Sequence, residues 1–338
     1  MSNVITAAKE LGPRFRFVGL LPIACLGAIT LALVWSGAPG HAPDLSRLAR
    51  RVDDVGAVEA MIWAAGLLIF ALVVEPLQGS AVRLLSGRWG TSMVALAIAA
   101  PGRAWHRWRL DRLQQRSARI AGESLDSAAM ERRQAAAALL RYYPPAARVL
   151  PTLLGNILLA AEIRGGVRYG LDTAVLWPRL YHVLPDRVAG TVNDLRNQFD
   201  LAARFCTAFI TAAAVCTVIL APYGWWLSVP VLMLFLAALS YRSATAAAKA
   251  YTIGVETAFD LGRFALLRAL HLPLPTDLLA EVRANQQLSV FLLDGNQALF
   301  RLRETGSGIN FVYEHPVEEP STCNLPNPPN PQAPSQGG

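Results

Sequence analysis

The feature that most constrains the fold is a set of four apolar runs, each close to the length of a bilayer crossing. A helix needs about 20 predominantly apolar residues to cross the hydrocarbon core of a membrane. The runs occupy residues 17–36, 58–77, 205–221 and 225–241. Only the turn sequence PYG separates the last two, so we expect a helical hairpin. The sequence therefore predicts an all-α integral membrane protein whose four transmembrane helices form two hairpins.

The composition agrees with a membrane protein. Hydrophobic residues make up 53% of the 338 residues and charged residues 16%, whereas soluble globular proteins have about 25% charged residues. The mean hydropathy is +0.33. The net charge of +7 comes from arginines dispersed along an Ala-, Gly- and Pro-rich chain, which fits a coding bias, so it does not predict a nucleic-acid partner. The first run could instead be a cleaved signal peptide, but its length favours a span.

The distribution of arginine predicts the orientation. Seventeen arginines, from Arg83 to Arg196, lie between the second and third runs, and only three lie in the loop 37–57. Positive residues are retained on the cytoplasmic side of a membrane. We therefore expect a membrane protein with 37–57 as an outer loop, 78–204 as a helical cytoplasmic or interfacial segment, and both termini in the cytoplasm.

A basic helix with tryptophans lies early in the middle segment, within RAWHRWRLDRLQQRSARI. Basic residues combined with tryptophan suit a membrane surface that carries anionic head groups. A solvated helix beside a bundle is the alternative. The residues predicted to contact the membrane surface are Arg103, Trp105, Arg107, Trp108, Arg109 and Arg112.

The stretch LPTLLGNILLAAE, residues 150–162, is as apolar as a span but about half as long. Its apolar residues recur at helical spacing, with Gly155, Asn156 and Glu162 toward the other side, so we expect an amphipathic helix at the inner membrane surface. A second such helix follows in RYGLDTAVLWPRLYHVLP. These helices could pack on each other, on lipid, on another subunit or on a cytoplasmic protein. The predicted contact residues are Leu153, Leu154, Ile157, Leu158, Trp177 and Tyr181.

These two stretches together resemble a block found in an uncharacterised family of multi-pass membrane proteins of bacteria, especially actinobacteria. The block has the form LPTxLGNxLxAAE…YGLD…WPRLYxxLP, and the likeness covers about 40 residues. The resemblance implies no activity, so no functional residue follows from it. The arrangement of two membrane hairpins around a helical segment is also similar to bestrophin-type anion channels in topology, without any bestrophin motif.

The C-terminal region, 242–315, is predicted to be cytoplasmic. A helix should continue from the fourth run to about Leu270, where Pro273 and Pro275 stop it, and a second helix should end at Asp294-Gly295. ALFRLR and INFVYEH alternate around ETGSG, which indicates a small β-hairpin. The tail 316–338 has seven prolines and is predicted to be disordered.

Few polar residues in the predicted spans could line or gate a pore. Thr207 and Thr211 lie one turn apart in the third run and could line a pore, although threonines in membrane helices also bond to their own backbone. Glu75, just before Pro76, could act as a gate, or it could lie among head groups at a helix end.

The sequence predicts no catalytic residue, no metal site and no cofactor, because its five histidines are scattered and no catalytic or phosphate-binding motif is present. Two function classes remain. The first is an oligomeric membrane channel or pore-forming effector, gated by its cytoplasmic helical layer; four spans without a charge in their interior would need a homo-oligomer to enclose a pore. The second is a non-conducting membrane scaffold that binds a partner. A membrane-embedded enzyme has less support than either.

Overall fold

The computed structural model describes residues 21–121, 127–294 and 313, and these form helices and connecting turns with no strand among them. The all-α prediction is therefore confirmed for the described residues. An apolar helix, Leu21–Trp35, comes first. The helices that follow are α2 (Leu45–Asp54), α3 (Ala57–Leu85), α4 (Met93–Ala121), α5 (Ser127–Leu140), α6 (Leu153–Arg164), α7 (Thr173–Val183), α8 (Asp186–Leu220), α9 (Ser228–Ala269) and α10 (Leu278–Asp294).

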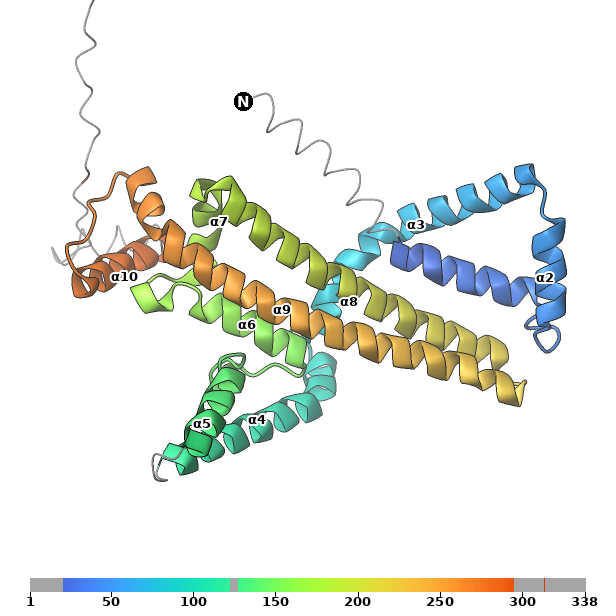
Figure 1. Ribbon diagram of the computed structural model, residues 1–338, viewed down its shortest axis with the longest axis horizontal. Helices are drawn as coiled ribbons and strands as arrows, with labels where there is room; N and C mark the ends of the chain where they lie inside the picture. Colours follow the sequence, from blue (N-terminus) through green and yellow to red (C-terminus); the bar gives the residue numbers. More distant parts are fainter. Residues whose placement is uncertain (1–20, 122–126, 295–312, 314–338) are drawn as a thin grey trace, which may run out of the picture.

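Helices α8 and α9 form a long antiparallel hairpin along the longest axis of the molecule (Figure 1). With 35 and 42 residues, they are about 52 and 63 Å long. Both are therefore longer than the roughly 30 Å hydrocarbon core of a bilayer. We call residues 205–241, around the turn Gly224–Leu227, the hairpin tip. The remainder of α8 and α9 is the hairpin base.

Three helices are long and apolar enough to cross a membrane: Ala57–Val74 within α3, α8, and α9 with the turn before it. The sequence predicted four. The helix Leu21–Trp35 has 15 described residues, fewer than a crossing needs, and residues 17–20 of the predicted run lie outside the described residues. The three helices are compatible with a membrane protein.

The helix Leu21–Trp35 lies between α3 and the hairpin tip. Ile23 packs against Ala71 of α3, and Leu26 packs beside Ala212 and Met233 of the tip. At the far end of this helix, the rings of Trp35 and Trp63 are 5.5 Å apart. Tyr223, at the turn of the hairpin, donates a hydrogen bond to the carbonyl oxygen of Pro39. The hairpin turn is therefore attached to the segment that follows Leu21–Trp35.

The hairpin base carries the main core of the molecule. Side chains from α7, α9 and α10 pack together there, with Leu176, Leu180 and Phe259 fully buried. An ion pair between Arg263 and Glu281, with N and O atoms 2.8 Å apart, joins α9 to α10. Helix α9 ends at Ala269, close to the predicted end near Leu270, and α10 ends at Asp294, as predicted. Their packing makes the base a compact layer rather than a set of separate helices.

Helix α6 lies within this layer, so the prediction of its environment needs correction. Leu154, Ile157 and Asn156 are all 0% exposed, because α6 packs against α9, the side chain of Phe199 in α8 and the end of α3. Leu154 and Ile157 therefore cannot face lipid or another chain, and Asn156 is not on an exposed side. An apolar helical face needs a cover, but its sequence does not say whether the cover is lipid or the rest of the chain.

Three segments meet tightly at Pro151, just before α6. A Cβ atom on Gly155 would lie 2.0 Å from the backbone oxygen of Ser86, and one on Gly102 would lie 2.5 Å from the backbone oxygen of Pro151. Gly87 lies against the ring of Pro151 and has φ +70°, a conformation that glycine adopts readily. The end of α3 and the starts of α4 and α6 can approach this closely only because these positions lack side chains. We call this place the glycine crossing.

Helices α4 and α5 form an arm that projects to one side of the hairpin (Figure 1). Leu110 and Leu113 of α4 pack with Tyr143 and Val149, so one face of α4 is buried. The predicted β-hairpin and the tail 316–338 lie outside the described residues, apart from Tyr313, as does the N-terminal segment 1–16. The predicted domain boundaries at 77, 204 and 241 fall inside α3, α8 and α9, so the predicted spans and cytoplasmic segments share continuous helices.

Candidate functional site

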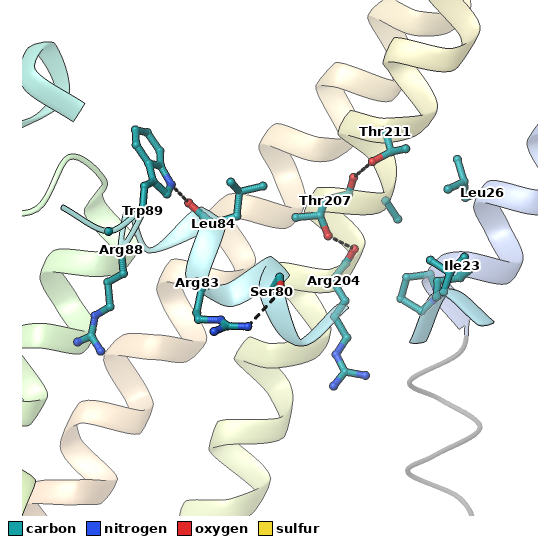
Figure 2. A pocket seen from close by; sticks show the side chains of 14 residues that line it. Ile23, Leu26, Ser80, Arg83, Leu84, Arg88, Trp89, Arg204, Thr207 and Thr211 are labelled. Atoms are coloured by element: carbon teal, nitrogen blue, oxygen red, sulfur yellow. Dashed lines mark hydrogen bonds between the residues drawn. The ribbon is translucent and has the colours of Figure 1, made fainter. Parts of the chain in front are cut away.

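A cavity of about 730 Å³ lies between the helix Leu21–Trp35, the end of α3 and the middle of α8 (Figure 2). Much of its wall is apolar, but three arginines and three hydroxyl groups also line it. We call it the arginine pocket. Its lining residues that bear on function are Ser80, Arg83, Arg88, Arg204, Thr207 and Thr211.

The charged groups of the pocket come from different parts of the chain. Arg83 lies in the last turn of α3, Arg88 in the loop that follows, and Arg204 at the boundary between the base and the tip of α8. Figure 2 shows the three guanidinium groups toward one side of the pocket and the two threonines toward the other. The pocket therefore has a cationic end and an end with hydroxyl groups.

Only one of the three arginines forms an ion pair in the described part of the chain. Arg88 donates to both carboxylate oxygens of Glu162, at 2.5 and 2.6 Å. Arg83 donates to the hydroxyl of Ser80 at 3.3 Å. Among the described residues, no carboxylate lies within 4.0 Å of Arg83 or Arg204. Two guanidinium groups thus leave donors for a ligand.

The structure places the predicted pore residues Thr207 and Thr211 together on the wall of this pocket. Each also bonds to its own helix: Thr207 donates to the carbonyl of Arg204 at 3.0 Å, and Thr211 to that of Thr207 at 2.9 Å. Their hydroxyl hydrogens are used, while their oxygens can still accept a bond. The side chain of Glu75, the predicted gate, lies outside the described residues.

The predicted contact residues of α6 and α7 separate into two groups. Leu154 and Ile157 belong to the core, as described above. Leu158 and Trp177 line a second cavity of about 450 Å³, and Trp177 and Tyr181 line a third of about 230 Å³. These two cavities share Trp177 and several other residues. We call them together the α7 groove.

The basic helix predicted from the sequence is part of α4. Trp105 and Trp108 are 57% and 46% exposed, with ring centroids 5.0 Å apart, and the guanidinium of Arg112 lies 4.5 Å from the centre of the Trp108 ring. Arg107 and Arg109 are exposed, and Arg103 is half-buried. An aromatic and basic surface of this kind is uncovered within the described chain.

The opposite face of α4 holds a buried histidine that the sequence did not mark. His106 is 7% exposed, and its Nδ1 lies 3.0 Å from the hydroxyl oxygen of Tyr143. Burial, together with the positive charge of Arg109, lowers the pKa of His106. Burial also raises the pKa of Tyr143. Both side chains therefore favour their neutral forms, and they join α4 to the segment after α5.

The sequence reasoning missed the arginine pocket as a site, although a signal was present. Arg204 directly precedes the third predicted span, and Arg83 follows the second by six residues. Both flank a span on the arginine-rich side, so they should lie at a similar depth. From the sequence, the distribution of arginine predicts only the orientation of the spans in the membrane. The structure shows that Arg83 and Arg204 line one cavity.

No protein-family model, curated protein or solved structure matches this chain. Within the described residues, no group of three or more His, Cys, Asp and Glu side chains is placed to hold a metal ion. The function must therefore be argued from the geometry of the helices and the pockets.

Proposed function

We propose that this protein is a subunit of an oligomeric channel, or pore-forming effector, in a bacterial cytoplasmic membrane. The hairpin tip, the first part of α3 and the helix extending through Leu21–Trp35 would cross the bilayer, giving four crossings with both termini in the cytoplasm. The hairpin base with α6, α7 and α10 would be the cytoplasmic layer that gates the pore. The exposed tryptophans and arginines of α4 would rest on anionic head groups at the inner surface.

The observation that carries the proposal is the position of the arginine pocket. It lies where the proposed crossings reach the cytoplasmic boundary, and its wall combines guanidinium and hydroxyl groups with apolar side chains. Polar groups within membrane helices are costly and usually line a path for ions or water. We infer that the pocket is the inner mouth of a conducting path. A single chain encloses this mouth incompletely, so other subunits would complete the path.

An uncovered surface on α9 supports assembly. Ile253, Leu261 and Phe264 are 45%, 64% and 36% exposed, and they lie on one side of the helix. These residues are about 18–35 Å beyond the hairpin tip along the helix axis, farther than lipid tails would reach. A neighbouring subunit is the cover that fits a channel.

The first experiment is the mass of the purified complex in detergent, measured by light scattering that subtracts the bound detergent. A closed ring of four or more subunits is expected. A monomer or a dimer would refute a ring-shaped channel.

Ion-flux measurements on the reconstituted protein then test whether the arginine pocket is the inner mouth of the conducting path. Thr207→Leu combined with Thr211→Leu should change the rate of ion flux, because it removes two of the three hydroxyl groups from the pocket. Thr191→Leu is the matched control, since Thr191 bonds to its own helix in the same way, through the carbonyl of Arg187, but lies outside the pocket. Equal flux in all three proteins would argue against conduction through this pocket.

The α7 groove favours a second candidate function, a non-conducting scaffold that binds a cytoplasmic protein. Trp177 and Tyr181 are partly exposed beside an open groove, and aromatic side chains are common anchors in protein interfaces. For a scaffold, Trp177→Ala with Tyr181→Ala should abolish partner binding, and the purified protein should conduct nothing. For a channel, the same variant should still conduct.

A further inference from the structure

We propose that the arginine pocket binds a phosphate group, carried either by an anionic phospholipid or by a free phosphate-class anion. Arg83 of α3 and Arg204 of α8 would hold the anion between them. The inference concerns ligand binding by the same site, but it does not require that the protein conducts ions.

The first argument is the imbalance of charge. Arg83, Arg88 and Arg204 line one cavity, and no described Asp or Glu lines it. Arg88 is compensated by Glu162 outside the lining, which leaves the guanidinium groups of Arg83 and Arg204 without a carboxylate within 4.0 Å in the described chain. Arg204 also interacts electrostatically with Asp200, one turn earlier in α8, without forming an ion pair. A guanidinium group that has no ion-pair partner and lies beside an apolar wall attracts a counter-ion more strongly than one in water does.

The second argument is the chemistry of arginine. The planar guanidinium presents several donors in a fixed fork, which matches the oxygens of a phosphate group. The hydroxyl of Ser80 accepts a hydrogen bond from Arg83 and so helps to fix the position of one fork. Figure 2 shows the side chains of Arg83 and Arg204 on the same side of the pocket, with the guanidinium of Arg83 turned toward Ser80.

The third argument is the shape of the rest of the pocket. A volume of about 730 Å³ is far more than one inorganic anion occupies. The remaining wall is largely apolar, with Ile23, Leu26 and Leu84 among its side chains. A ligand with an anionic head and an apolar remainder would fill both parts. Phospholipid has this chemistry and is the most abundant such molecule at a membrane.

Binding should have a measurable structural consequence. Arg83 and Arg204 belong to different helices, so an anion held by both would join α3 to α8. A ligand that binds only the folded state raises stability, and the gain grows with the logarithm of the ligand concentration once the site is saturated. The unfolding midpoint of the protein is therefore a direct readout of binding.

The test uses the purified full-length protein in a neutral detergent. One arm compares phosphatidylglycerol with phosphatidylcholine, and a second compares inorganic phosphate with chloride at equal ionic strength. We expect phosphatidylglycerol, inorganic phosphate or both to raise the unfolding midpoint by several degrees. A rise in the first arm alone assigns the ligand to lipid, and a rise in the second arm assigns it to a free anion. No rise in either arm overturns the proposal.

Variants test whether the effect comes from the pocket. Arg83→Gln with Arg204→Gln should weaken the apparent affinity by about tenfold or more, equivalent to about 1.4 kcal/mol. Arg187→Gln with Arg268→Gln removes the same charge from exposed positions outside the pocket and should leave the affinity unchanged. An equal loss in both pairs would mean general surface attraction and would overturn the proposal.

A milder variant covers the case in which the double substitution fails to fold. Arg204→Lys keeps the charge but removes the fork, so it should fold and bind with intermediate affinity. Unchanged affinity in this variant would overturn the assignment of Arg204. Binding and flux are measured separately, so binding without flux would refute the channel alone, and flux without binding would refute this inference alone.

Discussion

Two apolar helical stretches of this molecule, α6 and the first part of α3, have similar side chains and opposite surroundings. Leu154 and Ile157 of α6 are 0% exposed, whereas Val58 and Ile62 of α3 are 72% and 66% exposed. Among the described residues, other helices cover α6 but leave the first part of α3 exposed. The stability of the chain should therefore depend more on the packing around α6 than on that around the first part of α3. Substitutions around α6 should lower the free energy of unfolding more than substitutions in the first part of α3.

The largest effect should come from the glycine crossing. Gly155→Ala would place a methyl group 2.0 Å from the backbone oxygen of Ser86, and a backbone atom cannot move aside as a side chain can. We expect a loss of more than about 4 kcal/mol in the free energy of unfolding, at the exceptional end for a single substitution. The control is Gly66→Ala in α3, where a Cβ would meet nothing within 4 Å. Equal unfolding midpoints of the two variants in detergent would contradict this prediction.

The next effect concerns buried volume. Leu154→Ala should lower the free energy of unfolding by about 3 kcal/mol, because it removes a fully buried side chain and leaves a cavity. Leu72→Ala in α3, where Leu72 is 49% exposed, should cost much less in detergent. Denaturant titration followed by circular dichroism compares the two. The contrast between α6 and α3 would fail if Leu72→Ala were as harmful as Leu154→Ala.

A smaller effect should follow from the loss of a buried amide. Asn156 donates to the carbonyl oxygens of Leu150 and Thr152, at 3.0 and 2.8 Å, and accepts from the backbone N–H of Leu150 at 2.8 Å. Asn156→Ala should cost about 1–3 kcal/mol in total, because the backbone N–H and carbonyl groups of Leu150 lose their side-chain partner. Asn193→Ala, at an exposed position of α8, should change stability little. A stable Asn156→Ala protein would mean that water replaces the amide.

The smallest effect should be a dependence on pH in the arm. The pKa of His106 is lowered in the folded state, so the unfolded state binds a proton more readily. Stability should be constant above about pH 6.5 and should fall as the pH drops below that value, by at most about 1.4 kcal/mol per pH unit. Faster trypsin cleavage in α4 and α5 at low pH would report this loss.

Two histidine variants complete that test. His106→Gln should remove the pH dependence, because a neutral amide takes the place of the imidazole. His182→Gln, at an exposed position of α7, should retain it. Persistence of the dependence in His106→Gln would assign the proton to another group.

Much of the helical architecture follows from local signals in the sequence. The apolar runs mark the long helices, the turn PYG marks the hairpin, and Pro273 follows the end of α9 closely. These features depend on neighbouring residues, which the sequence shows directly.

The arrangement of the site was harder to predict because it depends on distant residues. Arg83 and Arg204 are separated by more than 100 positions, and nothing local shows that they line one cavity. Asn156 looks like a polar residue on an exposed side, but the turn before α6 encloses it. Burial of a polar side chain becomes readable only when its hydrogen-bond partners are known.

The glycine crossing also bears on how the chain is made. Pro151 follows Gly87 by 64 residues, so at about 5–20 residues per second its synthesis lags by about 3–13 s. During that interval the end of α3 has been synthesised, but the segment around Pro151 that packs against it has not. In the proposed topology, the first apolar helices would therefore insert into the membrane before they pack against the base. Their attachment to the base would be a later event, and the translation of residues 88–151 would set its timing.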